Sequence, residues 1–295
     1  AYPAAAFSIH IQLTTITINS TLGAMHNSLR ATAALLAAGG LLLTATACSS
    51  SDSQDSAAEP GAQKKISIVA STSIWADVAQ AVADTASGVD IEVKPIVEGN
   101  GVDPHHFEPS AADIAKAEDA DLLVVNGGGY DSWIYQAVSE QDNIISALPL
   151  TDHGKLADDP NVMTIDAAKA TAKKDPTKVT NIEGNEHIWY DPAALDEVAG
   201  NIADQINELN TDAHASTERV DSHVNRLRDK LKELPGDLSY AQTEPIADYI
   251  MKYTSGKDVT PEGYRKATIS EGEPTAADLA AFTLSLIHIS EPTRL

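Results

Sequence analysis

The feature that most constrains the fold of this chain is the alternation of apolar runs and amphipathic stretches between residues 65 and 148. Residues 65–70 and 89–97 are rich in β-branched residues and are expected to form strands, whereas residues 121–126 are nearly all apolar. Such an apolar run is typical of a strand buried on both faces of a parallel sheet. Because a stretch with helical spacing follows each run, we predict an α/β fold with a parallel sheet. The helices are expected at residues 74–86, 109–120 and 130–138, and a further strand at residues 143–148.

The segment at residues 99–110 is expected to be a stiff loop. Pro104 and Pro109 remove backbone donors and fix φ, so the segment cannot be a regular helix or a central strand. The loop follows the second predicted strand, and ligands of open α/β sheets bind outside the carboxyl ends of the strands. Three glycines at residues 127–129 follow another strand and should lie nearby.

This loop carries two histidines, His105 and His106. A neutral imidazole binds Zn, Mn, Fe, Cu and Ni, and a proline-bounded loop fixes its direction. Neighbouring side chains in an extended loop diverge, so His106 is not expected to reach the same ion as His105. We take His105 as the candidate ligand. The alternative for both His105 and His106 is an ordinary surface histidine in a loop.

Two further candidates lie later in the chain. His187 lies in the stretch Asn185-Glu-His-Ile-Trp-Tyr-Asp-Pro192, beside an aromatic pair and before an Asp-Pro turn. Glu244 follows a predicted strand at residues 238–242 and is held by Pro245. The alternative for His187 is a core or turn histidine. The alternative for Glu244 is an acid at a helix N-terminus, where the helix dipole favours it.

The second half of the chain is expected to be mainly helical. Residues 152–183 are polar and are interpreted as a mobile loop with little structure. Two amphipathic helices follow, and the second, at residues 211–234, would span roughly 35 Å. It could be a rigid strut between two lobes or a surface helix of a single domain. A second lobe would begin at the strand at residues 238–242, and helices are expected at residues 192–209, 246–253, 261–267 and from 275.

The segment at residues 25–48 looks like a bacterial lipoprotein signal peptide. It has an early arginine, a short apolar run and small residues that lead to Cys48, the only cysteine. Cys48 is therefore the expected lipid attachment site, and residues 49–63 the tether to a folded part on the extracytoplasmic face of the membrane. The alternative is a buried helix with a chance cysteine.

Both ends of the chain look foreign to the natural protein. Residues 1–24 precede the plausible start at Met25 and are interpreted as upstream translation. Residues 284–295 match the translation of a transposase adapter used in DNA library preparation. The second lobe is therefore expected to be incomplete beyond Thr283.

The net charge of −23 argues against nucleic acid or anionic lipid as a partner. It would favour cations, although its simplest role is solubility.

Three motifs together resemble a known family. They are Asp103-Pro-His-His-Phe-Glu-Pro-Ser110, the stretch around His187, and Thr243-Glu-Pro245. They are similar, in the right order, to motifs of the zinc/manganese substrate-binding lipoproteins of ABC-type metal importers, the periplasmic solute-binding protein family 9 in the TroA-like superfamily. The resemblance implies two parallel-sheet α/β lobes joined by one long rigid helix, with one Zn²⁺ or Mn²⁺ ion in the cleft.

The resemblance also implies a ligand set and partners. The first two histidine ligands of the family fall on His105 and His187, and the third ligand falls on Glu244. The fourth, an acidic residue late in the second lobe, has no counterpart here. An ABC permease is the implied partner, and a monomer is expected. The domains are expected at residues 1–24 (upstream translation), 25–48 (signal peptide), 49–63 (tether), 64–209 (N-terminal lobe), 210–235 (linking helix), 236–283 (start of the second lobe) and 284–295 (adapter).

Ligand chemistry leaves the metal and two other functions open. Two imidazoles with one or two carboxylates suit Zn²⁺, and oxygen ligands suit Mn²⁺ equally. An adhesin or passive metal scavenger would share the site without a permease. A secreted metallohydrolase would need an open coordination position and a base, for which Glu108 is one candidate. The sequence has no His-Glu-x-x-His helix, and Glu186-His187 has the wrong order.

Overall fold

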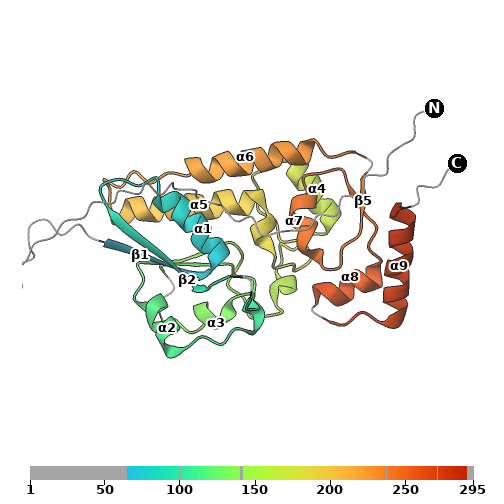
Figure 1. Ribbon diagram of the computed structural model, residues 1–295, viewed down its shortest axis with the longest axis horizontal. Helices are drawn as coiled ribbons and strands as arrows, with labels where there is room; N and C mark the ends of the chain where they lie inside the picture. The colour runs from blue at the N-terminus through green and yellow to red at the C-terminus, as the bar shows by residue number, and fades with distance from the viewer. Residues whose placement is uncertain (1–64, 100, 140–141, 237, 271, 291–295) are drawn as a thin grey trace, which may run out of the picture. The chain divides into compact units, whose positions relative to one another are not determined.

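A computed structural model describes residues 65–99, 101–139, 142–236, 238–270 and 272–290, without the side chains of residues 288 and 290 (Figure 1). The predicted upstream segment, the signal peptide with Cys48 and the tether lie outside the described residues. So do residues 291–295 of the predicted adapter segment. Among the described helices, none combines the length and the apolar character needed to cross a membrane.

The first lobe is built on four parallel strands in the order β2-β1-β3-β4, which confirms the predicted parallel sheet. In the centre of the sheet Ile68 lies opposite Val93 of β2 on one side and Leu122 of β3 on the other. The strands are β1 (Lys65–Thr72), β2 (Asp90–Val97), β3 (Leu122–Val125) and β4 (Ile144–Ser146).

Helices cover both faces of this sheet, as Figure 1 shows. Because side chains alternate along a strand, Ile68 and Ala70 join one hydrophobic cluster and Val69 joins the other. The first cluster includes side chains from α1 (Ser73–Ala83), α5 (Pro192–Leu209) and α6 (Glu218–Lys232), and also Ala168 and Tyr249 from two further helices. The second cluster includes side chains from α2 (Ala111–Glu118) and α3 (Ser132–Tyr135).

The turn after β3 lies at the carboxyl edge of the sheet and requires glycine. Gly127 has a φ of 74°, and an added Cβ would lie 2.2 Å from the carbonyl oxygen of Leu148. The buried carboxylate of Asp131 accepts hydrogen bonds from the backbone N–H groups of Asn126 (2.6 Å) and Gly127 (3.0 Å). Burial raises the pKa of Asp131 to about 6, although these hydrogen bonds oppose the shift. The turn is therefore a rigid platform beside the loop that carries His105.

The prediction of a mobile, unstructured loop at residues 152–183 is wrong. The segment contains η2 (Leu156–Asp158) and α4 (Ile165–Lys174), and Met163 pairs with Ile182 in an isolated bridge. The side chain of Thr164 caps α4 by accepting from the N–H of Ala167 (3.3 Å). The alanine-rich helix buries only small side chains, so its apolar stripe is weak in the sequence.

The linking helix is shorter than predicted. Residues 211–217 lie outside α6, whose 15 residues span about 22 Å. The backbone of this segment finds partners elsewhere, since the carbonyl of Ala213 accepts from the N–H of Ser87 (2.8 Å) and Ala215 exchanges two hydrogen bonds with the Asn207 side chain. These contacts compete with helix formation.

The second lobe contains a parallel pair of two-residue strands. The first, β5, lies inside the predicted strand, but β6 is too short to give a pattern in the sequence. The fold class is therefore α/β with two lobes, as predicted, whereas the domain boundaries stay a prediction. The elements are β5 (Ser239–Tyr240), η4 (Pro245–Ala247), α7 (Asp248–Met251), β6 (Lys257–Asp258), α8 (Glu262–Ile269) and α9 (Ala276–Ser290), so α9 includes part of the predicted adapter segment.

Candidate metal-binding cleft

The three predicted ligands line one cleft of about 550 Å³. His105 and His187 come from loops of the first lobe, and Glu244 comes from the loop after β5. His106 and the exposed Glu273 also line this cleft. The structure therefore brings the side chains from the three sequence motifs to a common space.

His105 lies in the short helix η1 (Pro104–His106), and Asp103 orients its ring. The Asp103 carboxylate accepts from the backbone N–H of His105 (3.0 Å) and lies 2.7 Å from Nδ1 of the same residue. Partial burial raises the pKa of Asp103, but the hydrogen bonds from His105 outweigh it and leave the pKa below its ordinary value. Since a carboxylate can only accept, the contact with Asp103 assigns a proton to Nδ1, and an ion would bind at Nε2 in place of any proton there.

Other contacts hold the His105 loop against the sheet edge. The indole of Trp133 donates to the carbonyl of Pro104 (2.9 Å), and the ring of Tyr130 packs edge-on against His105 with centroids 4.7 Å apart. Both aromatic residues follow the glycine turn after β3. The predicted proximity of these two loops is confirmed.

His187 repeats the arrangement of His105. It immediately precedes η3 (Ile188–Tyr190), and the side-chain oxygen of Asn185 accepts from its backbone N–H (3.0 Å) and lies 2.8 Å from its Nδ1. An oxygen two residues before the histidine therefore engages Nδ1 in both loops, and this is how outer groups orient metal-binding imidazoles.

Asn185 also connects His187 with the loop that carries Glu244. Its amide nitrogen donates to the carbonyl of Pro245 (2.6 Å) and to the carboxylate of Asp248 (3.2 Å). Glu244 is the N-terminal flanking residue of η4, as its alternative role required, although within the described residues of this turn its side chain makes no capping hydrogen bond.

A buried ionic cluster stabilises the segment that follows Glu244. Arg265 of α8 contacts the carboxylates of Asp248 (2.7 Å) and Glu183 (2.9 Å). Burial lowers the pKa of Arg265, but its carboxylate partners outweigh burial and raise the pKa overall. The guanidinium therefore stays charged and joins the second lobe to the loop just before His187.

The candidate ligands surround the cleft but do not converge on one point. In the described part of the chain, no three His, Cys, Asp or Glu side chains are grouped closely enough to hold an ion. The ring centroids of His105 and His187 are 6.4 Å apart. Two imidazoles on one tetrahedral zinc ion have centroids roughly 5 Å apart, so the rings need to approach by roughly 1 Å.

Sequence reasoning missed two residues beside His105. The carboxylate of Glu186 contacts Nε2 of His105, and the ring centroid of His153 lies 6.0 Å from that of His105. The recurrence of Asp103 and Asn185 two residues before a histidine was a usable signal for the orienting groups. The position of His153 gave no such signal, because it depends on the path of residues 152–183.

The architecture defines the class: two α/β lobes with a polar cleft between their loops are typical of substrate-binding proteins. The profile of the family described as ZnuA, zinc-uptake complex component A periplasmic, matches residues 68–286. The chain belongs to this family.

Individual relatives are distant. The chain is 26% identical to the metal ABC transporter substrate-binding lipoprotein FimA of Streptococcus parasanguinis over 85% of this chain and 76% of the relative. It is 23% identical to the manganese ABC transporter substrate-binding lipoprotein PsaA of Streptococcus pneumoniae serotype 4 over 78% and 71%. A mutant of the laminin-binding adhesin Lmb from Streptococcus agalactiae, 19% identical over 76% and 77% of the two chains, has the same fold with a TM-score of 0.52.

Proposed function

We propose that this protein is the extracytoplasmic receptor of an ABC-type importer, which captures one Zn²⁺ or Mn²⁺ ion and delivers it to a membrane permease. The observation that carries the proposal is the common cleft of His105, His187 and Glu244. The names of the relatives, which describe substrate-binding lipoproteins of metal ABC transporters, support the same role.

The donor set of the cleft fits such a cargo. In our proposal His105 and His187 bind the ion through Nε2, because each Nδ1 is engaged by an oxygen two residues earlier. Glu244 supplies a carboxylate from the second lobe. Two nitrogen donors and one oxygen donor suit Zn²⁺, and further oxygen donors would suit Mn²⁺.

We propose attachment to the membrane through a lipid on Cys48, with the folded part on the extracytoplasmic face and acting as a monomer. The signal-like sequence before Cys48 and the lipoprotein names of the relatives support this location. A net charge of −23 would concentrate cations near the protein.

We assign capture and delivery, and not catalysis, to the cleft. A metallohydrolase needs an open coordination position and a base beside it, whereas a receptor needs a ligand set that surrounds its cargo. Membership of the substrate-binding family supports the receptor.

Alanine substitution of the two histidines tests the site. We expect the wild type to bind one Zn²⁺ or Mn²⁺ ion after dialysis, and His105→Ala and His187→Ala to lose most of it, since each removes a nitrogen donor. Elemental analysis gives the metal content. His106→Ala is the matched control, because His106 lines the same cleft but is not a proposed ligand. Full metal content in both the His105 and His187 variants would refute the site.

A further inference from the structure

We propose that Glu186 is a further ligand of the captured ion, beside His105, His187 and Glu244. This inference rests on the proposed function. It adds a second carboxylate to the ligand set from a residue that directly precedes His187 in the chain.

The position of the Glu186 carboxylate is the main argument. It contacts Nε2 of His105, the nitrogen that remains for an ion because Asp103 engages Nδ1. Two donor atoms on one zinc ion lie roughly 3.3 Å apart. A carboxylate oxygen in hydrogen-bond contact with that nitrogen therefore needs only a small shift to share the ion with it.

The backbone of Glu186 is held firmly at the sheet edge. Its carbonyl accepts from the side chain of Asn126 (2.9 Å) and from the N–H of Ile188 (2.7 Å). Asn126 in turn accepts from the buried indole of Trp75 (3.2 Å). Such a support allows a side chain to present its carboxylate in a defined direction.

Burial of the Glu186 carboxylate makes its binding to a cation energetically favourable. The residue is only 8% exposed, and a buried carboxylate is costly unless a charged or hydrogen-bonding partner compensates for the lost water. In the present arrangement the imidazole of His105 contributes such a contact. A divalent ion would provide stronger compensation at the same place.

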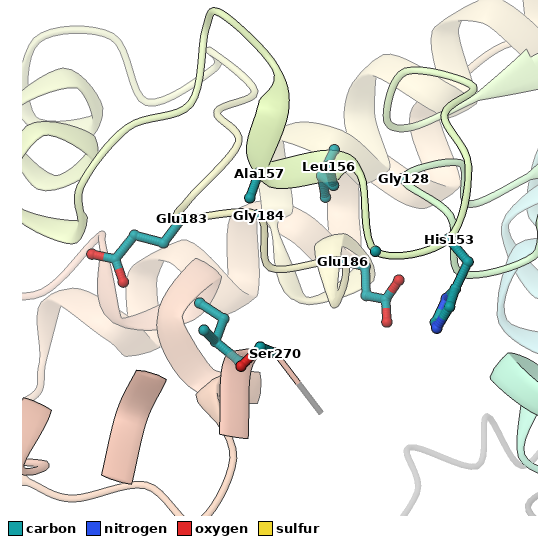
Figure 2. Close-up of a pocket in the computed structure, with 10 residues that line it drawn as sticks. Gly128, His153, Leu156, Ala157, Glu183, Gly184, Glu186 and Ser270 are labelled. Carbon is teal, nitrogen blue, oxygen red and sulfur yellow. The ribbon is translucent and has the colours of Figure 1, made fainter. Parts of the chain in front are cut away.

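Glu183 of the same loop shows the contrast. Its carboxylate binds Nε (3.0 Å) and Nη2 (2.9 Å) of Arg265, so it is committed to a structural ion pair. Figure 2 shows the carboxylate of Glu186 turned away from Glu183 and toward the side where His153 lies. Glu183, Glu186 and His153 line a cavity of about 200 Å³. Of the two glutamates, Glu186 faces the histidines.

A second carboxylate changes the chemistry of the site. Two neutral imidazoles and two carboxylates balance the charge of a divalent ion. The additional oxygen donor favours Mn²⁺, because carboxylate ligands suit this ion whereas imidazole and thiolate ligands suit Zn²⁺. Glu186 would thus contribute to both affinity and metal preference.

The first test compares Glu186→Gln with Glu108→Gln in the full chain. Glutamine keeps the size of the side chain and a hydrogen-bonding group for His105 but is a weaker ligand. We expect Glu186→Gln to weaken Mn²⁺ binding by roughly 10- to 100-fold, and Zn²⁺ binding by less, in a competition titration with a fluorescent chelator. Glu108 is exposed in the His105 loop, so its variant removes the same charge and should stay within about twofold of the wild type.

The second test needs no variant and therefore does not depend on the folding of one. In a crystal of the wild type grown with Zn²⁺, located by its anomalous signal, a Glu186 oxygen should lie about 2.0–2.2 Å from the ion. A Glu186 carboxylate that has swung away from the bound ion would overturn the inference, as would unchanged or tighter Mn²⁺ binding by Glu186→Gln.

The outcomes separate this inference from the proposed function. If the wild type binds no ion, or if His187→Ala keeps full metal content, the receptor site itself fails and the role of Glu186 fails with it. If His187→Ala loses the ion while Glu186→Gln keeps wild-type affinity, the receptor stands and only the role of Glu186 is refuted.

Discussion

At the scale of single residues, the main feature is the repeated use of an oxygen two positions before a histidine. Asp103 and Asn185 each bind both the backbone N–H and Nδ1 of the histidine that follows. Short Asp and Asn side chains commonly close such turns on their own backbone. Here the turn also selects the ring nitrogen that remains for an ion.

Substitution of Asp103 tests this orienting role. The Asp103 side chain is 58% exposed, so Asp103→Ala should leave the melting temperature nearly unchanged but weaken Zn²⁺ binding by roughly 10-fold or more. Asp103→Asn keeps an acceptor oxygen and should recover most of the affinity. Calorimetric titration of the three proteins measures it. Equal affinities in all three would contradict the role of Asp103.

The sequence indicated His105 and His187 as candidate ligands because their local motifs are distinctive, but it could not predict their neighbours. His105 and Glu186 are 81 positions apart, so their contact follows only from the assembled fold. The proximity of His153 to His105 has the same origin. Long-range contacts of this kind have no local pattern.

At the scale of helices and strands, prediction succeeded where a strong local signal exists. Helix α2, which lies within the predicted helix at residues 109–120, begins with a capping box: Ser110 accepts from the N–H of Asp113 (3.3 Å), and Asp113 accepts from the N–H of Ser110 (3.1 Å). Helix α5 has the predicted bounds, Pro192–Leu209. In contrast, α4 has a weak apolar stripe, and the start of α6 is displaced by hydrogen bonds that the sequence does not reveal.

Removal of the α2 cap should be measurable. Ser110→Ala removes the side-chain acceptor for the N–H of Asp113 in the first turn of α2 and should lower the free energy of unfolding by about 1 kcal/mol. Chemical denaturation gives the value. Ser222→Ala, at an exposed interior position of α6, is the control and should cause little change or a small gain, because alanine is the better helix former. An equal loss in both variants would argue against the cap.

At the scale of the whole molecule, buried polar contacts between the lobes supplement the chain connections. Lys252, at the end of α7, binds Asp191 at the start of α5, with both side chains fully buried and 2.5 Å between their charged atoms. Tyr253 donates to the same carboxylate (2.6 Å). The α/β class and the order of the lobes were predictable from local patterns, whereas this cluster was not, because its members lie far apart in the sequence.

Removal of one partner from the buried Lys252–Asp191 pair should strongly destabilise the fold. Lys252→Met leaves a buried carboxylate without its cation and should lower the free energy of unfolding by about 3–5 kcal/mol. The matched control is Lys232→Met, which removes the exposed pair with Asp229 and should cost less than about 1 kcal/mol. Denaturation curves of the two variants measure the difference, and similar midpoints would contradict the assignment.

Helix α4 has a consequence for how the polypeptide holds together. Although it precedes α5 in the chain, Lys169 of α4 contacts the carbonyl of Gly256 and lies over the ring of Tyr240 (5.8 Å) in the second lobe. A protease that cuts within residues 211–217 would therefore leave α4 covalently part of the larger fragment. Helix α4 would still contact the smaller fragment, which contains the second lobe. Non-covalent contacts of α4, as well as the continuous polypeptide, therefore hold the second lobe in place.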